Sequence, residues 1–317
     1  MKLIDPYNRK IDYLRISITD RCNLRCIYCM PWGVPRCAEK SELLTARTLL
    51  SFIKTARNYG LKKVRLTGGE PLLREDVLEL VRGIKELGVE DLSLTTNGLL
   101  LDEKAPALKR AGLDRVNVSL DSMRPERLRA LTGGGDVAKV FEAISRAEEL
   151  GLAPVKINMV PIRGLNEDEI LSFARLTLVK PYHVRFLELM PFRNSPWKRD
   201  RLVKAHEAKA LISSNLGRLK WKGQEGSSKN FALDGALGTL GFISPESDHF
   251  CSRCNRLRIT AKGKLRPCLF STEELEIKNS YSEEELEQIL LEAVRRKPAG
   301  KKEATSLPFE AMSQIGG

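Results

Sequence analysis

Short apolar, β-branched runs alternate along this chain with segments of helical periodicity, and this alternation constrains its fold more than any other feature. Six runs have the length and composition of strands: residues 13–19, 63–67, 91–96, 115–120, 155–160 and 184–189. Apolar residues recur at three- and four-residue spacing over residues 45–59, 74–87, 136–150 and 166–178. Strands that alternate with helices favour a parallel sheet. The chain is therefore predicted to be an α/β protein whose six strands curl into a partial or full barrel.

The length, charge and cysteine content narrow the class of protein. The 317 residues suffice for one barrel domain, predicted over residues 1–215, and a smaller extension over residues 216–317. Seven cysteines, two sets of them at metal-binding spacing, favour a reducing compartment without disulfides. The chain shows no signal-peptide core and no apolar run long enough for a membrane span. We therefore expect a soluble, cytoplasmic protein.

The formal net charge of +12 favours a polyanionic partner. Nucleic acid, a nucleotide triphosphate and an anionic membrane would all satisfy it. The basic residues are spread along the chain, often beside Glu, and no known nucleic-acid-binding motif organises them. Most of them are expected to form a solvated surface.

Three cysteines lie close together in DRCNLRCIYCMP, directly after the first predicted strand: Cys22, Cys26 and Cys29. Three thiolates so spaced can face one metal centre and leave a coordination position open for a reactant. With the aromatic Tyr28 before the last cysteine, the motif resembles that of the radical S-adenosylmethionine (SAM) superfamily. There the cysteines hold three irons of a 4Fe–4S cluster, and SAM binds the fourth. Three buried or zinc-binding thiols are the alternative.

Polar motifs follow the next predicted strands. After the second strand comes Thr67-Gly68-Gly69-Glu70-Pro71, in which paired glycines would let a ligand approach the backbone and Glu70 could accept a hydrogen bond from an ammonium group. This resembles the motif that holds the SAM amino group. The hydroxyl- and amide-rich ends of the third and fourth strands contain Thr95 and Ser119, although turns or helix caps would explain these residues equally well.

A second cysteine motif, C-x2-C-x13-C, lies near the C-terminus: Cys251, Cys254 and Cys268. A structural zinc site completed by His249 is one reading of it. Arg256 and Arg258, which follow directly, alternate on an extended segment and so make a fork suited to phosphates or a purine edge. Cys37 has no motif partner and is expected to be a packed or surface thiol.

The two cysteine motifs and the terminal Gly316-Gly317, taken together, resemble the GTP 3',8-cyclase family of molybdenum cofactor biosynthesis over essentially the whole chain. The resemblance implies an incomplete six-stranded α/β barrel with a second 4Fe–4S cluster across its open mouth. It implies two 4Fe–4S clusters and SAM as cofactors, and an electron donor as partner. The substrate would be GTP and the product 3',8-cyclo-7,8-dihydro-GTP, which a cyclic pyranopterin monophosphate synthase would receive. Nucleic acid and membrane would not be partners, and a homodimer is one alternative for the assembly.

The resemblance also assigns residues one by one. The first cluster is assigned to Cys22, Cys26 and Cys29, and the second to Cys251, Cys254 and Cys268. The SAM contacts are Tyr28, Gly69, Glu70, Ser119 and Met190. The GTP contacts are Arg15, Arg65, Thr95, Lys156, Arg256 and Arg258. The last two, with Gly316 and Gly317 of a C-terminal tail inserted toward GTP, are the catalytic set.

Two other functions are also compatible with these sequence motifs. A radical SAM enzyme that matures peptides with an auxiliary cluster would share the first motif, although such enzymes usually carry more than three C-terminal cysteines. An iron–sulfur or zinc protein that binds nucleic acid would suit the net charge and the arginines of the second motif, but it leaves the Gly-Gly-Glu-Pro segment unexplained. No motif is recognised in residues 191–248.

Overall fold

The structure is a computed structural model that describes residues 2–31, 33, 35–190, 197, 199–301, 312 and 315. Its strands form one sheet in the order β12-β11-β10-β1-β2-β3-β4-β5-β6-β9-β8-β7. The six predicted strands are confirmed as a consecutive parallel run. They are β1 (Tyr13–Ser17), β2 (Lys63–Thr67), β3 (Asp91–Thr96), β4 (Arg115–Ser119), β5 (Lys156–Met159) and β6 (His183–Leu187).

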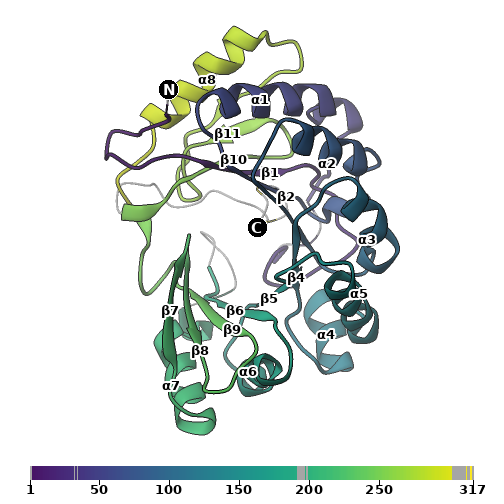
Figure 1. Cartoon of the computed structure of the whole chain (residues 1–317), viewed down its shortest axis with the longest axis vertical. Coiled ribbons are helices and arrows are strands. Elements are labelled where there is room, and N and C mark those ends of the chain that lie inside the picture. The colour runs from purple at the N-terminus through teal and green to yellow at the C-terminus, as the bar shows by residue number, and fades with distance from the viewer. Residues whose placement is uncertain are drawn as a thin grey trace.

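The helices lie outside the curled sheet (Figure 1). The four predicted helices are α1 (Ala46–Asn58), α2 (Val77–Glu86), α5 (Val137–Glu149) and α6 (Ile170–Val179). Four further helices among the described residues were not predicted: α3 (Leu101–Arg110), α4 (Pro125–Thr132), α7 (Ala205–Leu216) and α8 (Glu283–Arg295). Single 3-10 turns lie at Lys40–Glu42, Pro71–Leu73, Glu167–Glu169, Arg199–Arg201 and Cys251–Arg253. Thr45 and Asp136 cap α1 and α5 by accepting a backbone N–H, which explains where these helices begin.

Strands from the last third of the chain extend both ends of the six-stranded run. Beyond β6 lie β9 (Thr239–Ile243), which is parallel to β6, and the antiparallel strands β8 (Ser228–Ala232) and β7 (Lys220–Glu225). At the other end β10 (Arg256–Ile259) pairs parallel to β1, and β11 (Lys264–Arg266) and β12 (Leu275–Glu276) follow antiparallel. The order is linear, so pairing does not close the barrel among the described strands. The division at residue 215 stays a prediction, and strands from both sides of it share this sheet.

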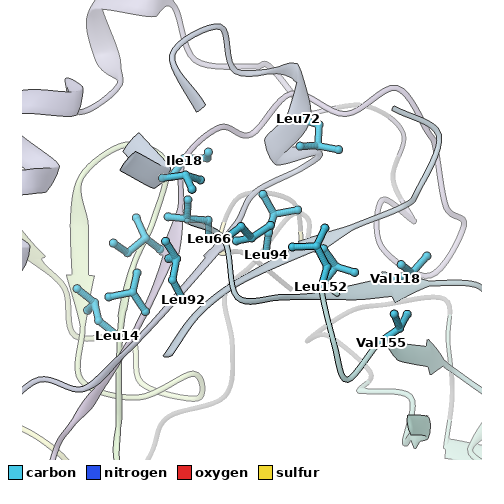
Figure 2. Packing of buried hydrophobic residues seen from close by; sticks show 14 of the residues in the cluster. Leu14, Ile18, Leu66, Leu72, Leu92, Leu94, Val118, Leu152 and Val155 are labelled. Carbon is cyan, nitrogen blue, oxygen red and sulfur yellow. The ribbon is translucent and has the colours of Figure 1, made fainter. Parts of the chain in front are cut away.

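Side chains alternate between the two faces of each central strand. Apolar residues such as Leu14, Leu66, Leu92, Leu94 and Val118 are buried against the helices, where Figure 2 shows them in one continuous layer. Their neighbours along each strand point to the inner face and are largely polar. This period of two explains why a parallel sheet covered by helices has a polar interior available for a ligand.

Candidate active site

A cavity of about 290 Å³ occupies the inner face of the sheet. It brings together thirteen of the predicted site residues: Cys22, Cys26, Cys29, Tyr28, Gly69, Glu70, Ser119, Met190, Arg15, Arg65, Thr95, Arg256 and Arg258. The central strands are parallel, so their C-terminal ends all lie at the same end of the barrel. The first cysteine loop follows the end of β1, whereas Arg115 and Lys156 begin β4 and β5. The thiols of the first cysteine loop therefore lie toward one end of the barrel, and Arg115 and Lys156 lie toward the other.

The paired glycines hold the first cysteine loop in place. The backbone N–H of Gly69 donates to the carbonyl of Thr19 (2.6 Å), and that of Glu70 donates to the carbonyl of Arg21 (2.8 Å). A Cβ added to Gly69 would overlap the carbonyl of Arg21. The sequence predicted a close approach of a ligand to these glycines, but the group that needs their small size in the structure is the backbone of the cysteine loop.

Glu70 has protein partners for its carboxylate. It is 1% exposed and accepts hydrogen bonds from Leu72 N (3.1 Å), Thr96 Oγ1 (2.8 Å) and Asn97 N (2.8 Å). Burial raises the pKa of this carboxyl to about 7. Glu70 thus ties the end of β2 to the end of β3. It also lines the cavity, as its predicted contact with the SAM amino group requires.

Asp121 is a site residue that the sequence reasoning missed. Its carboxylate accepts hydrogen bonds from the Tyr28 hydroxyl (2.6 Å) and from Val160 N (2.8 Å), so it joins the first cysteine loop to the ends of β4 and β5. Burial raises the pKa of Asp121 to about 6. Burial and the adjacent Asp121 raise the pKa of Tyr28 well above its ordinary value. The available signal was its position two residues after the predicted contact Ser119, at the end of β4.

Register places a row of cations across the inner face. Arg15 on β1 is level with Arg258 on β10 and with Arg65 on β2. Ser93 on β3 continues the row to Arg115 on β4. Burial, together with Arg258 and Arg65, lowers the pKa of Arg15 well below its ordinary value. Arg258 and Arg115 are buried and Arg15 and Arg65 are half-buried, and so many positive charges side by side favour an anionic ligand.

Two of the predicted GTP contacts have a buried polar atom without a partner. Arg15 Nε and Thr95 Oγ1 make no hydrogen bond within the part of the chain that the structure describes. Both residues line the cavity. Since buried polar atoms in native proteins are nearly always satisfied, these two atoms fit a site that a polar ligand completes.

Lys156, another predicted GTP contact, is already paired. Its ammonium lies 2.7 Å from both carboxylate oxygens of Glu225, and Arg185 donates to the same carboxylate at 2.9 Å. Burial, with Arg185 and Arg115 nearby, lowers the pKa of Lys156 to about 7. Although burial alone would raise the pKa of Glu225, Arg185 and Lys156 lower it to about 2. No local motif marks Arg185 or Glu225 in the sequence.

The second cysteine motif surrounds a smaller cavity of about 40 Å³ that Cys251, Cys254 and Cys268 line. Arg256 and Arg258 line this cavity and the large one, so these two arginines separate the two cysteine sites. His249, the candidate fourth zinc ligand, is exposed and lies outside the cavity lining.

Buried cations surround this second site. The Lys297 ammonium donates to the carbonyls of Arg256 (2.7 Å) and Pro267 (2.8 Å) and lies 3.6 Å from Cys254 Sγ. Burial would raise the pKa of Cys254, but Lys297 and Arg256 lower it to about 6. A thiol so placed is readily available as a thiolate ligand.

The thiols fit iron–sulfur clusters. All seven cysteines are free, and two sets of three line two separate cavities. Within the described residues no group of three or more His, Cys, Asp or Glu side chains is arranged to hold a single metal ion. A 4Fe–4S cluster binds each cysteine to a different iron, so its thiols need not converge on one point. Gly316 and Gly317 lie outside the described residues.

Comparisons with known proteins agree with this site. Residues 16–177 match the radical SAM superfamily, and residues 182–305 match the family described as Molybdenum Cofactor Synthesis C. The GTP 3',8-cyclase of Pelotomaculum thermopropionicum is 48% identical over 303 residues, which are 93% of each chain. That of Thermodesulfovibrio yellowstonii is 45% identical over 99% of each chain. SuiB of Streptococcus suis bound to S-adenosylmethionine has a similar fold, with a TM-score of 0.69 and 15% identity over 92% of this chain and 68% of that one.

The parallel sheet and the cysteine triplet beyond its first strand define a radical SAM enzyme. Within that class, the chain belongs to the GTP 3',8-cyclase family. The cofactors of this family are two 4Fe–4S clusters and SAM, and in this structure two sets of three thiols line two separate cavities.

Proposed function

We propose that this chain converts GTP to 3',8-cyclo-7,8-dihydro-GTP, the first step of molybdenum cofactor biosynthesis. The observation that carries the proposal is one cavity lined both by the first cysteine triplet and by a row of arginines on the central strands. A SAM-cleaving centre and a polyanionic nucleotide need these two environments within reach of each other.

Separate groups of residues would then hold the first cluster, SAM and GTP. Cys22, Cys26 and Cys29 would hold the first cluster, which with bound SAM supplies the radical that removes a ribose hydrogen. Gly69, Glu70, Ser119, Tyr28 and Met190, which all line the large cavity, would contact SAM. Arg15, Arg65, Thr95 and Lys156 would bind GTP, mainly through its phosphates, and fix which hydrogen faces the radical.

The second site would orient the base. Cys251, Cys254 and Cys268 would hold a cluster with one open iron position, where the guanine can bind. Arg256 and Arg258 stand between this site and the large cavity, so both can contact the nucleotide while the cavity walls keep water from the reacting atoms. Gly316 and Gly317 are assigned beside them, and truncation after Gln314 should then reduce cyclisation more than GTP binding.

Nucleotide selectivity tests the proposal. The cluster-loaded protein is incubated without oxygen with SAM and a reductant, and 5'-deoxyadenosine is measured with GTP, with ATP and with no nucleotide. GTP should stimulate SAM cleavage strongly, whereas ATP should not. Equal stimulation by both would instead favour a peptide-maturing or nucleic-acid-binding protein.

The remaining partners follow from the same proposal. Each turnover needs an electron donor, and a cyclic pyranopterin monophosphate synthase would receive the product. A homodimer is proposed for the assembly. No helix among the described residues is long and apolar enough to cross a membrane. The free thiols of all seven cysteines support a reducing, cytoplasmic location.

A further inference from the structure

The turn between β7 and β8 carries an acidic side chain into the cationic end of the large cavity. Glu225, Gly226, Ser227 and Ser228 all line that cavity. Glu225 is the last residue of β7, and its carboxylate contacts Lys156 and Arg185, which belong to β5 and β6. An anion of the protein therefore occupies Lys156, which the proposed function assigns to the substrate, together with the neighbouring Arg185.

The two sides of this ion pair differ in exposure to solvent. Lys156 and Arg185 are 2% and 4% exposed and are fixed within central strands. The Glu225 side chain is 38% exposed and stands next to the turn glycine Gly226, which has a φ of +57°. Two buried cations without an anion would be costly, whereas a half-exposed carboxylate can turn to water at small cost.

We propose that Glu225 is an internal counter-ion that takes the place of a substrate phosphate on Lys156 and Arg185, and that the β7–β8 turn withdraws it when the triphosphate binds. This inference rests on the proposed function. A carboxylate carries one negative charge and a triphosphate carries several, so the exchange favours the nucleotide with the larger charge. Glu225 would thus offset part of the positive charge on Lys156 and Arg185 in the empty site and make weakly charged ligands poor competitors.

The contacts of Arg185 support an exchange rather than a fixed structural pair. Glu225 receives only the Nη2 atom of this guanidinium, and the buried Nε atom has no hydrogen-bond partner among the described residues. A phosphate group with three oxygens can use both donors.

Binding measurements on the Glu225→Gln variant test the inference. Calorimetry is done on the cluster-loaded protein without SAM or reductant, using GTP and guanosine as the two ligands. The variant should bind GTP at least tenfold more tightly than the wild type, because no carboxylate has to be displaced. Its affinity for guanosine, which has no phosphate to reach the two cations, should not change. Glu276→Gln is the matched control, because Glu276 pairs with Lys264 on the exposed edge of the sheet, and it should change neither affinity.

A second variant covers the case in which Glu225→Gln does not fold. Glu225→Asp keeps the charge but shortens the side chain, so it should tighten GTP binding in the same direction by a smaller factor. Unchanged or weaker GTP binding in the folded variants would overturn the inference while leaving the proposed function intact. A wild-type protein that binds no GTP would overturn the proposed function itself.

Discussion

Single residues join the first cysteine loop to the strands behind it. Tyr28 within the loop donates to Asp121, which also accepts the N–H of Val160. Glycines 68 and 69 bring the loop backbone against the end of β2. The loop therefore owes its position to contacts that are in place without any cofactor, and loss of one contact should have a measurable effect.

Replacement of Tyr28 by Phe should show a pH-dependent loss of stability. The Tyr28 hydroxyl lowers the pKa of Asp121, which burial has raised from 3.8 to about 6. Without the hydroxyl this pKa rises further, so ionising Asp121 costs the folded state more at high pH. The loss should be about 1 to 2 kcal/mol at pH 8 and smaller at pH 5.5. Thermal unfolding at the two pH values measures it. In an Asp121→Asn background the effect of Tyr28→Phe should not depend on pH, and a pH-independent loss in the wild-type background would contradict the account.

Gly69→Ala should remove the first cluster and spare the second. The added Cβ would overlap the backbone of Arg21 and displace the start of the cysteine loop. Iron should fall from about eight to about four per chain, measured after anaerobic reconstitution. Gly83→Ala in α2 is the control, since its Cβ would meet only the flexible end of the Leu50 side chain and Gly83 lines neither cavity. Full iron content in Gly69→Ala would show that the loop tolerates the shift.

At the scale of elements, the second site depends on β10 and α8. Parallel pairing of β10 with β1 sets Arg258 beside Arg15 and brings the second cysteine motif to the mouth of the barrel. Helix α8 packs against α1, and Figure 1 shows the two helices side by side. Lys297, just beyond α8, reaches both halves of the cysteine motif.

The two cysteine sites should fail in different ways. Cys26 lines the large cavity and Cys268 the small one. Cys26→Ala should abolish SAM cleavage, whereas Cys268→Ala should spare cleavage more than cyclisation. Both 5'-deoxyadenosine and the nucleotide product are quantified for each variant. Equal losses of the two activities in both variants would contradict this division.

Lys297→Met should weaken the second site alone. The ammonium holds the carbonyls of Arg256 and Pro267 together, and an apolar side chain leaves both acceptors unpaired. We expect iron to fall toward about four per chain while SAM binding by the first site persists. Lys54→Met, which breaks the exposed pair between α1 and Glu283 of α8, should keep full iron. Full iron content in Lys297→Met would show that the contacts of Lys297 with the two carbonyls are not needed to hold the second cluster.

Across the whole molecule, sequence predicted what local patterns encode. Six strands and four helices follow from periodicity, and the cysteines and the Gly-Gly-Glu-Pro segment follow from spacing. Four helices were missed, among them α3, whose apolar pattern is short and contains Pro106. The pairing of β10 with β1 joins segments about 240 residues apart, and no local pattern encodes it. For the same reason Arg185 and Glu225 entered the site only through register and through the β7–β8 turn, whereas Asp121 lies two residues after Ser119 in the sequence.

Hydrogen transfer from GTP tests the central claim most directly. The cluster-loaded protein is given SAM, a reductant and GTP deuterated at C3', and both products are analysed by chromatography and mass spectrometry. The account predicts one deuterium in 5'-deoxyadenosine, because the radical from SAM removes that atom. The nucleotide product should have the elemental composition of GTP once hydrogen replaces the lost deuterium, and it should separate from GTP. 5'-Deoxyadenosine that forms without deuterium while GTP is recovered unchanged would contradict the account.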